Sequence, residues 1–456
     1  MDPKSFLDAN KRTRLEELFD FLRFPSISAR SEHRKDILAC AEWLSVHLNR
    51  IGIESEIMPT GGHPVVFGSK GSSPDKLTVL YYGHYDVQPV DPLNLWKTSP
   101  FEPIIDGDYI IARGSTDDKG QLFTHIKALE AFDATGTALP VNVKLLIEGE
   151  EESGGENLAG FVEENKELLK ADIVVVSDSG QFDKDKPAVT FGLRGVAFVE
   201  VKITGPSRDL HSGTFGGAVA NPINVLSRII ASMHDTDGKI LIDGFYDDAK
   251  PLSEWERKQY AKLPFSPERF LEKTGSRGLH GEKGYTVYEQ TWARPTVDVN
   301  GIMGGYQGEG GKTIIPSWAS CKITMRLVPD MKPDDICDKI EKHIRKICPP
   351  YVDCEIVKHG GASAVMVPTE GPWLDAAGRA IKRGFGIEPV FIREGGSIPI
   401  VGTFKRALGI DTLLLGWGQS DDNAHSPNER FSLMDFERGT YSALALIDEL
   451  AKVRVK

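Results

Sequence analysis

The sequence has no long uninterrupted apolar run, so none of its segments is predicted to cross a membrane. Residues 1–20 alternate charged with apolar side chains and lack the continuous apolar stretch of a secretory signal. Positive charge is also in deficit, since 54 Lys and Arg stand against 66 Asp and Glu, a formal net charge of -12. Because phosphate binding needs clustered positive charge, a nucleic-acid partner is not expected.

Cysteine is scarce as well, and the five cysteines include no C-x-x-C pair. Such thiols are typical of a cytosolic protein whose cysteines stay reduced, so we expect a cytoplasmic protein. Internal repeats and low-complexity segments are also missing. The chain has 456 residues, of which 40% are apolar and 26% charged. This length is greater than that of a domain built around one hydrophobic core. More than one globular domain is therefore predicted.

Buried strands alternate with helices in the first part of the chain. Residues 77–82, 141–147 and 173–176 are almost entirely apolar, as in strands that are covered on both faces. Helical periodicity at 4–22, 120–134 and 156–169 flanks or separates these runs. This alternation predicts an α/β domain with a mostly parallel central sheet flanked by helices.

The pattern changes near residue 193. Half-exposed strand patterns at 196–204, 296–302 and 320–328, with an amphipathic helix at 333–347, predict a smaller α+β domain. The stretch 235–296 is polar with scattered aromatic residues and supports no assignment. Three segments are expected: 1–192 and 361–456 form the α/β domain, and 193–360 is inserted between them.

Ionisable residues follow three of the predicted strands. His84 comes after the first, Glu151 and Glu152 after the second, and Asp178 after the third. Side chains at the carboxyl ends of parallel strands meet at one edge of the sheet, where such folds place their chemistry. The sequence therefore predicts a site at this edge.

Each local motif has a second interpretation. The pair His84 and Asp86 fits a metal ligand and the carboxylate that orients it, although a lone histidine is more often structural. Asp117 opens a helix, where an acidic residue is favoured whether or not it binds a cation. Glu151 and Glu152 could form a solvated acidic turn, or divide the roles of base and ligand. His425 lies in a polar loop before the last helix.

Taken together, the candidates form a recognisable ligand set. Two histidines and three carboxylates are expected of a co-catalytic zinc pair about 3.5–4 Å apart. Manganese and cobalt accept the same nitrogen and oxygen ligands, so the set does not choose among these metals. We expect two divalent ions per subunit, with zinc favoured and manganese as the alternative.

Four stretches of the chain resemble a known family. Residues 82–89, 96–120, 148–154 and 393–399 resemble the aminoacylase/carboxypeptidase-G/acetylornithine deacetylase superfamily of co-catalytic zinc metallopeptidases. Within it the chain is similar, nearly from end to end, to the carnosinase-like (cytosolic nonspecific) dipeptidase branch. The resemblance implies hydrolysis of dipeptides by a metal-activated water.

The resemblance also implies a role for each candidate of the metal site. His84 and Asp178 would hold one metal, Glu152 and His425 the other, Asp117 would bridge both, Glu151 would be the general base, and Asp86 would orient His84. The family further implies a cis peptide bond between Asp117 and Asp118.

In this family the inserted domain is a lid and dimerisation domain. The resemblance implies a homodimer in which His211 reaches the active site of the partner and stabilises the oxyanion. Thr313 and Arg326 would receive the carboxylate of a short peptide, whereas Gly396 and Ser397 would seat its backbone. An arginine suits this task because its guanidinium binds carboxylates through two parallel hydrogen bonds.

Two rival functions remain open. An N-acyl-amino-acid deacylase of the acetylornithine or succinyl-diaminopimelate type uses the same machinery, but those relatives usually carry methionine where this chain has Asp118. A binding protein that lost the chemistry would lack a ligand or the base, and none is missing here. Residues 235–290 match the family less clearly, so the substrate is less well defined than the chemistry.

Overall fold

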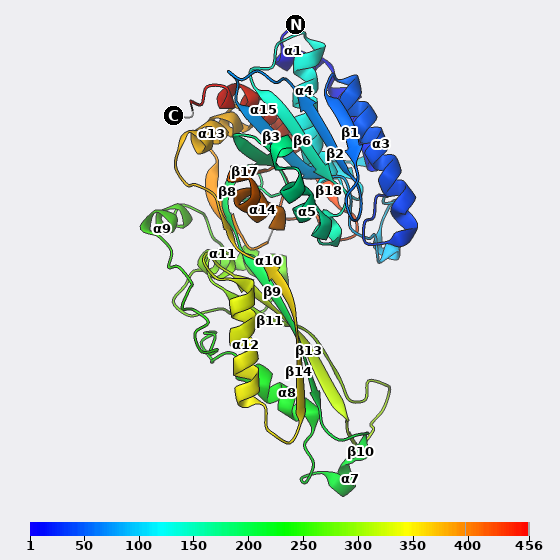
Figure 1. Cartoon of the computed structure of the whole chain (residues 1–456), viewed down its shortest axis with the longest axis vertical. Helices are drawn as coiled ribbons and strands as arrows, with labels where there is room; N and C mark the ends of the chain where they lie inside the picture. Colours follow the sequence, from blue (N-terminus) through cyan, green and yellow to red (C-terminus); the bar gives the residue numbers. More distant parts are fainter. Residues whose placement is uncertain (397, 455–456) are drawn as a thin grey trace. The chain divides into compact units, whose positions relative to one another are not determined.

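The computed structural model describes residues 1–396 and 398–454 and divides into two compact units (Figure 1). The first comprises Met1–Phe191, Val367–Ile392 and Thr403–Lys456. The second comprises Gly192–Met366 and Arg393–Gly402. The first unit contains all five residues of the predicted metal site.

Within the described residues, the large sheet has nine strands in the order β1-β2-β6-β3-β7-β17-β8-β15, with β16 paired to β8. Pairing is parallel between β6 and β3, β3 and β7, and β7 and β17, and it is antiparallel from β1 to β6 and from β17 to β15. The strands are β1 (Glu54–Met58), β2 (Val65–Lys70), β3 (Thr78–His84), β6 (Asn142–Glu148), β7 (Ile173–Val176), β8 (Ala188–Leu193), β15 (Val365–Met366), β16 (Val390–Glu394) and β17 (Asp411–Gly416).

Helices flank this sheet, and α1 to α4, α13 and α15 share one apolar core with it. They are α1 (Pro3–Ala9), α2 (Lys11–Leu22), α3 (Arg34–Arg50), α4 (Lys119–Ala134), α5 (Glu156–Glu164), α6 (Lys166–Leu169), α13 (Pro372–Phe385), α14 (Pro399–Leu408) and α15 (Leu433–Leu450). A separate three-stranded sheet has the strand order β18-β5-β4 and consists of β4 (Ile104–Asp106), β5 (Tyr109–Ile111) and β18 (Arg430–Ser432). Every helix of the described chain is too short or too polar to cross a bilayer.

The predicted α/β fold is confirmed, and the sheet is mixed: parallel at its centre and antiparallel at its margins. The strand predicted at 173–176 is β7, and all of its residues are buried. The single helix predicted over 4–22 is wrong, because α1 and α2 are separated at Asn10. The side-chain amide of Asn10 donates to the Phe6 carbonyl at 2.8 Å, a local bond that competes with the helical pattern.

The second unit is built on a four-stranded antiparallel sheet in the order β11-β13-β9-β14. One face is buried under α8 and α12, with Val199, Val201 and Ile323 in the shared core. The elements are β9 (Gly195–Thr204), β11 (Thr296–Gly304), β13 (Trp318–Leu327), β14 (Asp353–Ala362), α8 (Pro222–Ala231) and α12 (Pro333–Ile347). A two-stranded pair, β10 (Leu210–His211) with β12 (Ile314–Ile315), and the short helix α7 (Ser212–Phe215) lie at one end of this unit (Figure 1).

The stretch that the sequence left unassigned contains three short helices, α9 (Glu254–Tyr260), α10 (Pro267–Thr274) and α11 (Val287–Trp292). Two of them begin with a capping box. Ser253 and Glu256 cap α9, and Thr286 and Glu289 cap α11, each by reciprocal side-chain to backbone hydrogen bonds. The S/T-x-x-E signature was therefore present in the sequence at both starts.

Candidate metal centre

Five side chains of the first unit converge beyond the carboxyl ends of its parallel strands. His84 ends β3, Asp178 follows β7, and Glu152 lies in the loop after β6. Asp117 precedes α4, and His425 lies in the loop between β17 and β18. Their ligand atoms form two groups, each within 4.8 Å: His84 with Asp117 and Asp178, and Asp117 with Glu152 and His425.

Asp117 belongs to both groups. Its Oδ1 lies 3.3 Å from Nε2 of His84, and its Oδ2 lies 2.9 Å from Nε2 of His425. The other members complete each group, since Asp178 Oδ1 is 3.9 Å from His84 Nε2 and Glu152 Oε2 is 3.2 Å from His425 Nε2. One carboxylate thus faces two clusters, as a ligand bridging two cations would. The predicted cis peptide bond between Asp117 and Asp118 is present.

The donor atoms fit divalent cations. The Nε2 atom of His84 is buried without a hydrogen-bond partner of acceptable geometry, yet it faces two carboxylates. Hydrogen bonds to Asp117 and Glu152 raise the pKa of His425 to about 10. A cation in each group would displace these imidazole protons, because a ligating histidine is neutral and the negative charges then have a partner.

Asp86 contacts one ligand of each group: the ring of His84 and the backbone of Glu152. Its backbone carbonyl lies 3.1 Å from Nδ1 of His84, nearer than the predicted carboxylate at 3.4 Å, so the carbonyl fixes the ring and leaves Nε2 for the cluster. Its carboxylate, fully buried, accepts hydrogen bonds from the backbone N–H groups of Glu151 at 3.3 Å and Glu152 at 3.0 Å. The residue predicted to orient His84 therefore also holds the loop that carries Glu151 and Glu152.

Glu151 belongs to neither ligand group and is half-buried beside them. Burial, followed by the negative charges of Asp178 and Glu152, raises its pKa to about 9, against the opposing effect of His84. Divalent cations among those carboxylates would offset their charge and return the Glu151 side chain to its ionised form. An ionised carboxylate outside the ligand set is what a general base requires.

Sequence reasoning missed the residue that holds Asp117. Glu429 is fully buried, and its Oε1 accepts hydrogen bonds from the N–H groups of Thr116 at 2.9 Å and Asp117 at 3.1 Å. Its Oε2 accepts from Gly114 N at 2.9 Å and from Arg113 Nη1 at 2.7 Å. The only signal in the sequence was an acidic residue beside Arg430 in a polar loop, which is common in solvated turns.

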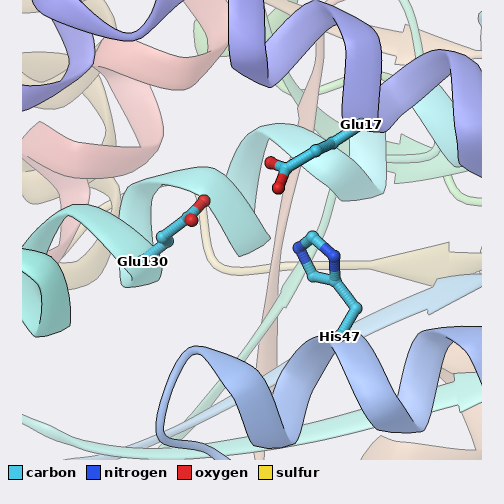
Figure 2. Close-up of side chains that lie close together, drawn as sticks. All are labelled: Glu17, His47 and Glu130. Carbon is cyan, nitrogen blue, oxygen red and sulfur yellow. The ribbon is translucent and has the colours of Figure 1, made fainter.

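A third group of candidate ligands is already satisfied by the chain itself. Glu17, His47 and Glu130 approach one another from α2, α3 and α4 (Figure 2). The ammonium group of Lys127 donates to a carboxylate oxygen of Glu17, lies 2.6 Å from Glu130 Oε2, and lies 3.1 Å from His47 Nε2. A side-chain cation therefore fills this cluster, which we do not regard as a metal site.

The predicted substrate residues of the second unit lie at two places. His211 and Thr313 are both exposed and adjacent, since His211 pairs with Ile314 and Ser212 N donates to the Thr313 carbonyl. Arg326 lies near the far end of β13. From Trp318 to Arg326 this strand spans about 26 Å at roughly 3.3 Å per residue. The structure therefore does not bring His211 and Thr313 together with Arg326 in one subunit.

Gly396 belongs to the Arg326 end of the second unit. Arg194 donates a hydrogen bond to the carbonyl of Gly395 at 3.3 Å. The residue after Arg194, Gly195, pairs with Leu327, which directly follows Arg326. Gly396 itself is exposed. Ser397 lies outside the described residues, so its predicted role stays a prediction.

Comparison with known proteins places the chain in a family. The sequence profile of peptidase family M20/M25/M40 matches residues 80–449, a range that includes all five candidate ligands. The chain belongs to this family and is a metallopeptidase, a hydrolase.

Its relatives are similar over most of their length. The Cys-Gly metallodipeptidase DUG1 of Saccharomyces cerevisiae is 36% identical over 462 residues, which cover 97% of this chain and 96% of that protein. The Beta-Ala-His dipeptidase of Homo sapiens is 34% identical over 403 residues, covering 86% of this chain and 78% of that protein. The solved M20 family metallo-carboxypeptidase Sso-CP2 from Sulfolobus solfataricus has a TM-score of 0.88 at 35% identity, covering 96% of this chain and 99% of its own. The predicted relationship to carnosinase-like dipeptidases is confirmed.

Proposed function

We propose that the protein is a dipeptidase that hydrolyses dipeptides and other short peptides with a free carboxyl terminus. The observation that carries this proposal is the sharing of Asp117 between two ligand groups, one with His84 and Asp178 and one with Glu152 and His425. The dipeptidase names of relatives that match nearly the whole chain support the substrate class.

The residues of the site would divide the reaction as follows. Two divalent ions, when bound, polarise the scissile carbonyl and lower the pKa of water. Glu151 takes the proton from the attacking water and later gives it to the leaving amine. Asp86 keeps both the His84 ring and the loop of Glu151 in place during these transfers. The ligand set accepts zinc, with manganese as the alternative.

A homodimer would complete the site. If His211 stabilises the oxyanion and Arg326 binds the carboxylate of the same dipeptide, the two residues come from different subunits. Within one subunit, β13 extends about 26 Å from Trp318 to Arg326. This length supports the arrangement, because a dipeptide is far shorter. The inserted unit then serves as lid and dimerisation domain, with Thr313 accompanying His211 and with Gly396 and Ser397 seating the peptide on the Arg326 side.

A cytoplasmic location is part of the proposal. All five cysteines of the chain are unbridged, which suits a reducing compartment.

The decisive experiment is a substrate panel on metal-depleted protein with zinc or manganese added back. Cys-Gly, Ala-Ala and β-Ala-His would be compared with N-acetylated amino acids, beside the Glu151→Gln variant. We expect dipeptide turnover that needs added metal and falls by at least about 100-fold in the variant. Faster hydrolysis of the N-acetylated compounds would identify a deacylase instead, and undiminished turnover in Glu151→Gln would exclude this base.

A further inference from the structure

Glu150 is a third glutamate in the acidic loop, and the mechanism above does not use it. It directly precedes Glu151 and Glu152 but belongs to neither ligand group. Its side chain is only 5% exposed, unlike that of a solvated acidic turn. A buried carboxylate needs hydrogen-bond donors, and these identify what it holds.

Both carboxylate oxygens of Glu150 are engaged by donors outside the metal centre. Oε1 accepts from the backbone N–H of Asn157 at 2.8 Å and from its side-chain Nδ2 at 2.9 Å. Oε2 accepts from the backbone N–H of His63 at 2.9 Å. Glu150 thereby ties the acidic loop to the first turn of α5 and to a second loop between β1 and β2.

The loop between β1 and β2 packs closely against the Glu150 carboxylate. Gly62 approaches so closely that a Cβ atom there would lie 2.0 Å from Glu150 Oε2. Thr60 closes the turn, since its hydroxyl accepts from Gly62 N at 3.0 Å and donates to the His63 carbonyl at 2.6 Å. The His63 ring in turn lies 3.2 Å from the Ser28 carbonyl. Each of these bonds restrains the loop that receives Oε2.

The acidic loop is therefore held on two sides. Asp86 accepts from the N–H groups of Glu151 and Glu152, and Glu150 binds the loop to His63 and Asn157. We propose that Glu150 is a positioning residue of the metal centre, which fixes this loop so that Glu152 reaches its ligand position and Glu151 its place as base. This inference rests on the proposed function for the role of Glu151, but its claim about Glu152 concerns metal binding alone.

Replacement by glutamine tests the carboxylate at constant volume. All three groups around Glu150 are donors, so a glutamine whose oxygen faces Asn157 turns its NH₂ toward the His63 N–H and loses that bond. Adding Asn157→Asp offers a partial repair: the glutamine oxygen can face His63 while its NH₂ donates to the new carboxylate, and only the backbone N–H of residue 157 loses its acceptor. The double variant also restores the net charge. Glu164→Gln, at the exposed end of α5, is the matched control.

Metal affinity is the primary measurement, because it needs no substrate. Metal-depleted protein would be titrated with manganese or zinc and the binding followed by calorimetry, with melting curves run in parallel. We expect Glu150→Gln to weaken binding about 10–100-fold, the range seen when groups supporting metal ligands are lost. The same variant should lower kcat by a similar factor and leave KM within about twofold, and the double variant should recover part of both losses.

Unchanged metal affinity and kcat in a well-folded Glu150→Gln protein would overturn the proposal. So would losses of metal affinity and kcat that disappear when Glu150→Gln is assayed well below its melting temperature, since the defect would then be one of general stability. If the wild-type protein hydrolysed no dipeptide, the proposed function would fail while the metal titration still tested the positioning role.

Discussion

The buried carboxylate of Glu429 accepts a hydrogen bond from the backbone N–H of Asp117 at 3.1 Å, so a second carboxylate fixes the backbone of the residue shared by both ligand groups. Arg113 compensates this acid through an ion pair of 2.7 Å in which both side chains are buried. Glu429 thus stabilises the segment 114–117 and keeps Asp117 between the two histidines.

Glu429→Gln should destabilise the protein by about 3 kcal/mol, because it leaves the buried Arg113 guanidinium without its negative partner. Its NH₂ group would also face backbone N–H donors on one side. Urea unfolding of metal-depleted protein would measure the change. Glu16→Gln, at an exposed pair with Arg12, is the control and should shift stability by less than about 1 kcal/mol. Equal effects in the two variants would contradict the role assigned to Glu429.

The shared position of Asp117 predicts how metal content responds to mutation. Asp117→Asn should abolish stable binding of both ions, since each group loses a charged ligand, whereas His425→Ala should leave the ion of the His84 group in place. Elemental analysis of purified variants would distinguish these outcomes. Loss of a single ion in Asp117→Asn would show that this carboxylate does not bridge.

The separation of His211 from Arg326 predicts complementation between inactive subunits. His211→Asn and Arg326→Met should each have little activity, but subunits mixed after reversible dissociation should regain about a quarter of the wild-type value. In a mixed dimer, one of the two sites receives an intact Arg326 from its own chain and an intact His211 from the partner. Mixtures that stay inactive, although mixed dimers are detected by mass spectrometry, would refute the shared site.

His47 predicts a pH dependence of stability. Burial, together with the charges of Lys127 and Arg50, lowers the pKa of His47 to about 2. The unfolded chain binds a proton at this residue below about pH 6.5, whereas the folded chain does not, so stability falls as the pH drops below that value. Between pH 7 and 5.5 the loss should be about 1 kcal/mol. Unfolding curves of His47→Gln should show a shallower decline, and an equal slope would contradict the low pKa.

Lys127→Met tests the cluster in Figure 2. Glu17 and Glu130 would lose the ammonium that neutralises them, and their side chains are only 15% and 18% exposed. We expect a loss of about 2–4 kcal/mol in unfolding free energy, because Glu130 would lose its ion pair with Lys127 and Glu17 would keep only its ion pair with Arg50. Differential scanning calorimetry would measure it. Lys166→Met, which removes an exposed pair with Glu163, should have little effect.

The sequence allowed the parallel strands to be located because they are continuous apolar runs, and strand ends then pointed to His84, Glu152 and Asp178. Their convergence needed only the rule that parallel strands share an edge. Glu429 could not be found this way, because its function depends on backbone N–H groups contributed by a segment 312 residues away in the chain. Such contacts leave no periodic signal.

The separate placement of Arg326 and Thr313 was equally hidden. Both fitted the same family role, but Thr313 precedes β12, which pairs with β10 in a separate small sheet, whereas Arg326 lies near the end of β13, and a linear pattern does not contain this arrangement. The helices α9 and α11 are a different case, because the sequence contains their capping signatures at Ser253 and Thr286, although both stand among many other polar residues.

The two histidines of the centre differ in exposure: the His84 side chain is fully buried, whereas that of His425 is 56% exposed and its backbone is left-handed, with φ of 62°. An ion beside His425 would therefore be more accessible to solvent and chelators than one beside His84, whose other ligands Asp117 and Asp178 are only 19% and 14% exposed. The two positions should fill and empty in sequence, with the outer ion exchanging while the inner one is retained. A protein carrying two different metals, one at each position, could be prepared by timed dialysis.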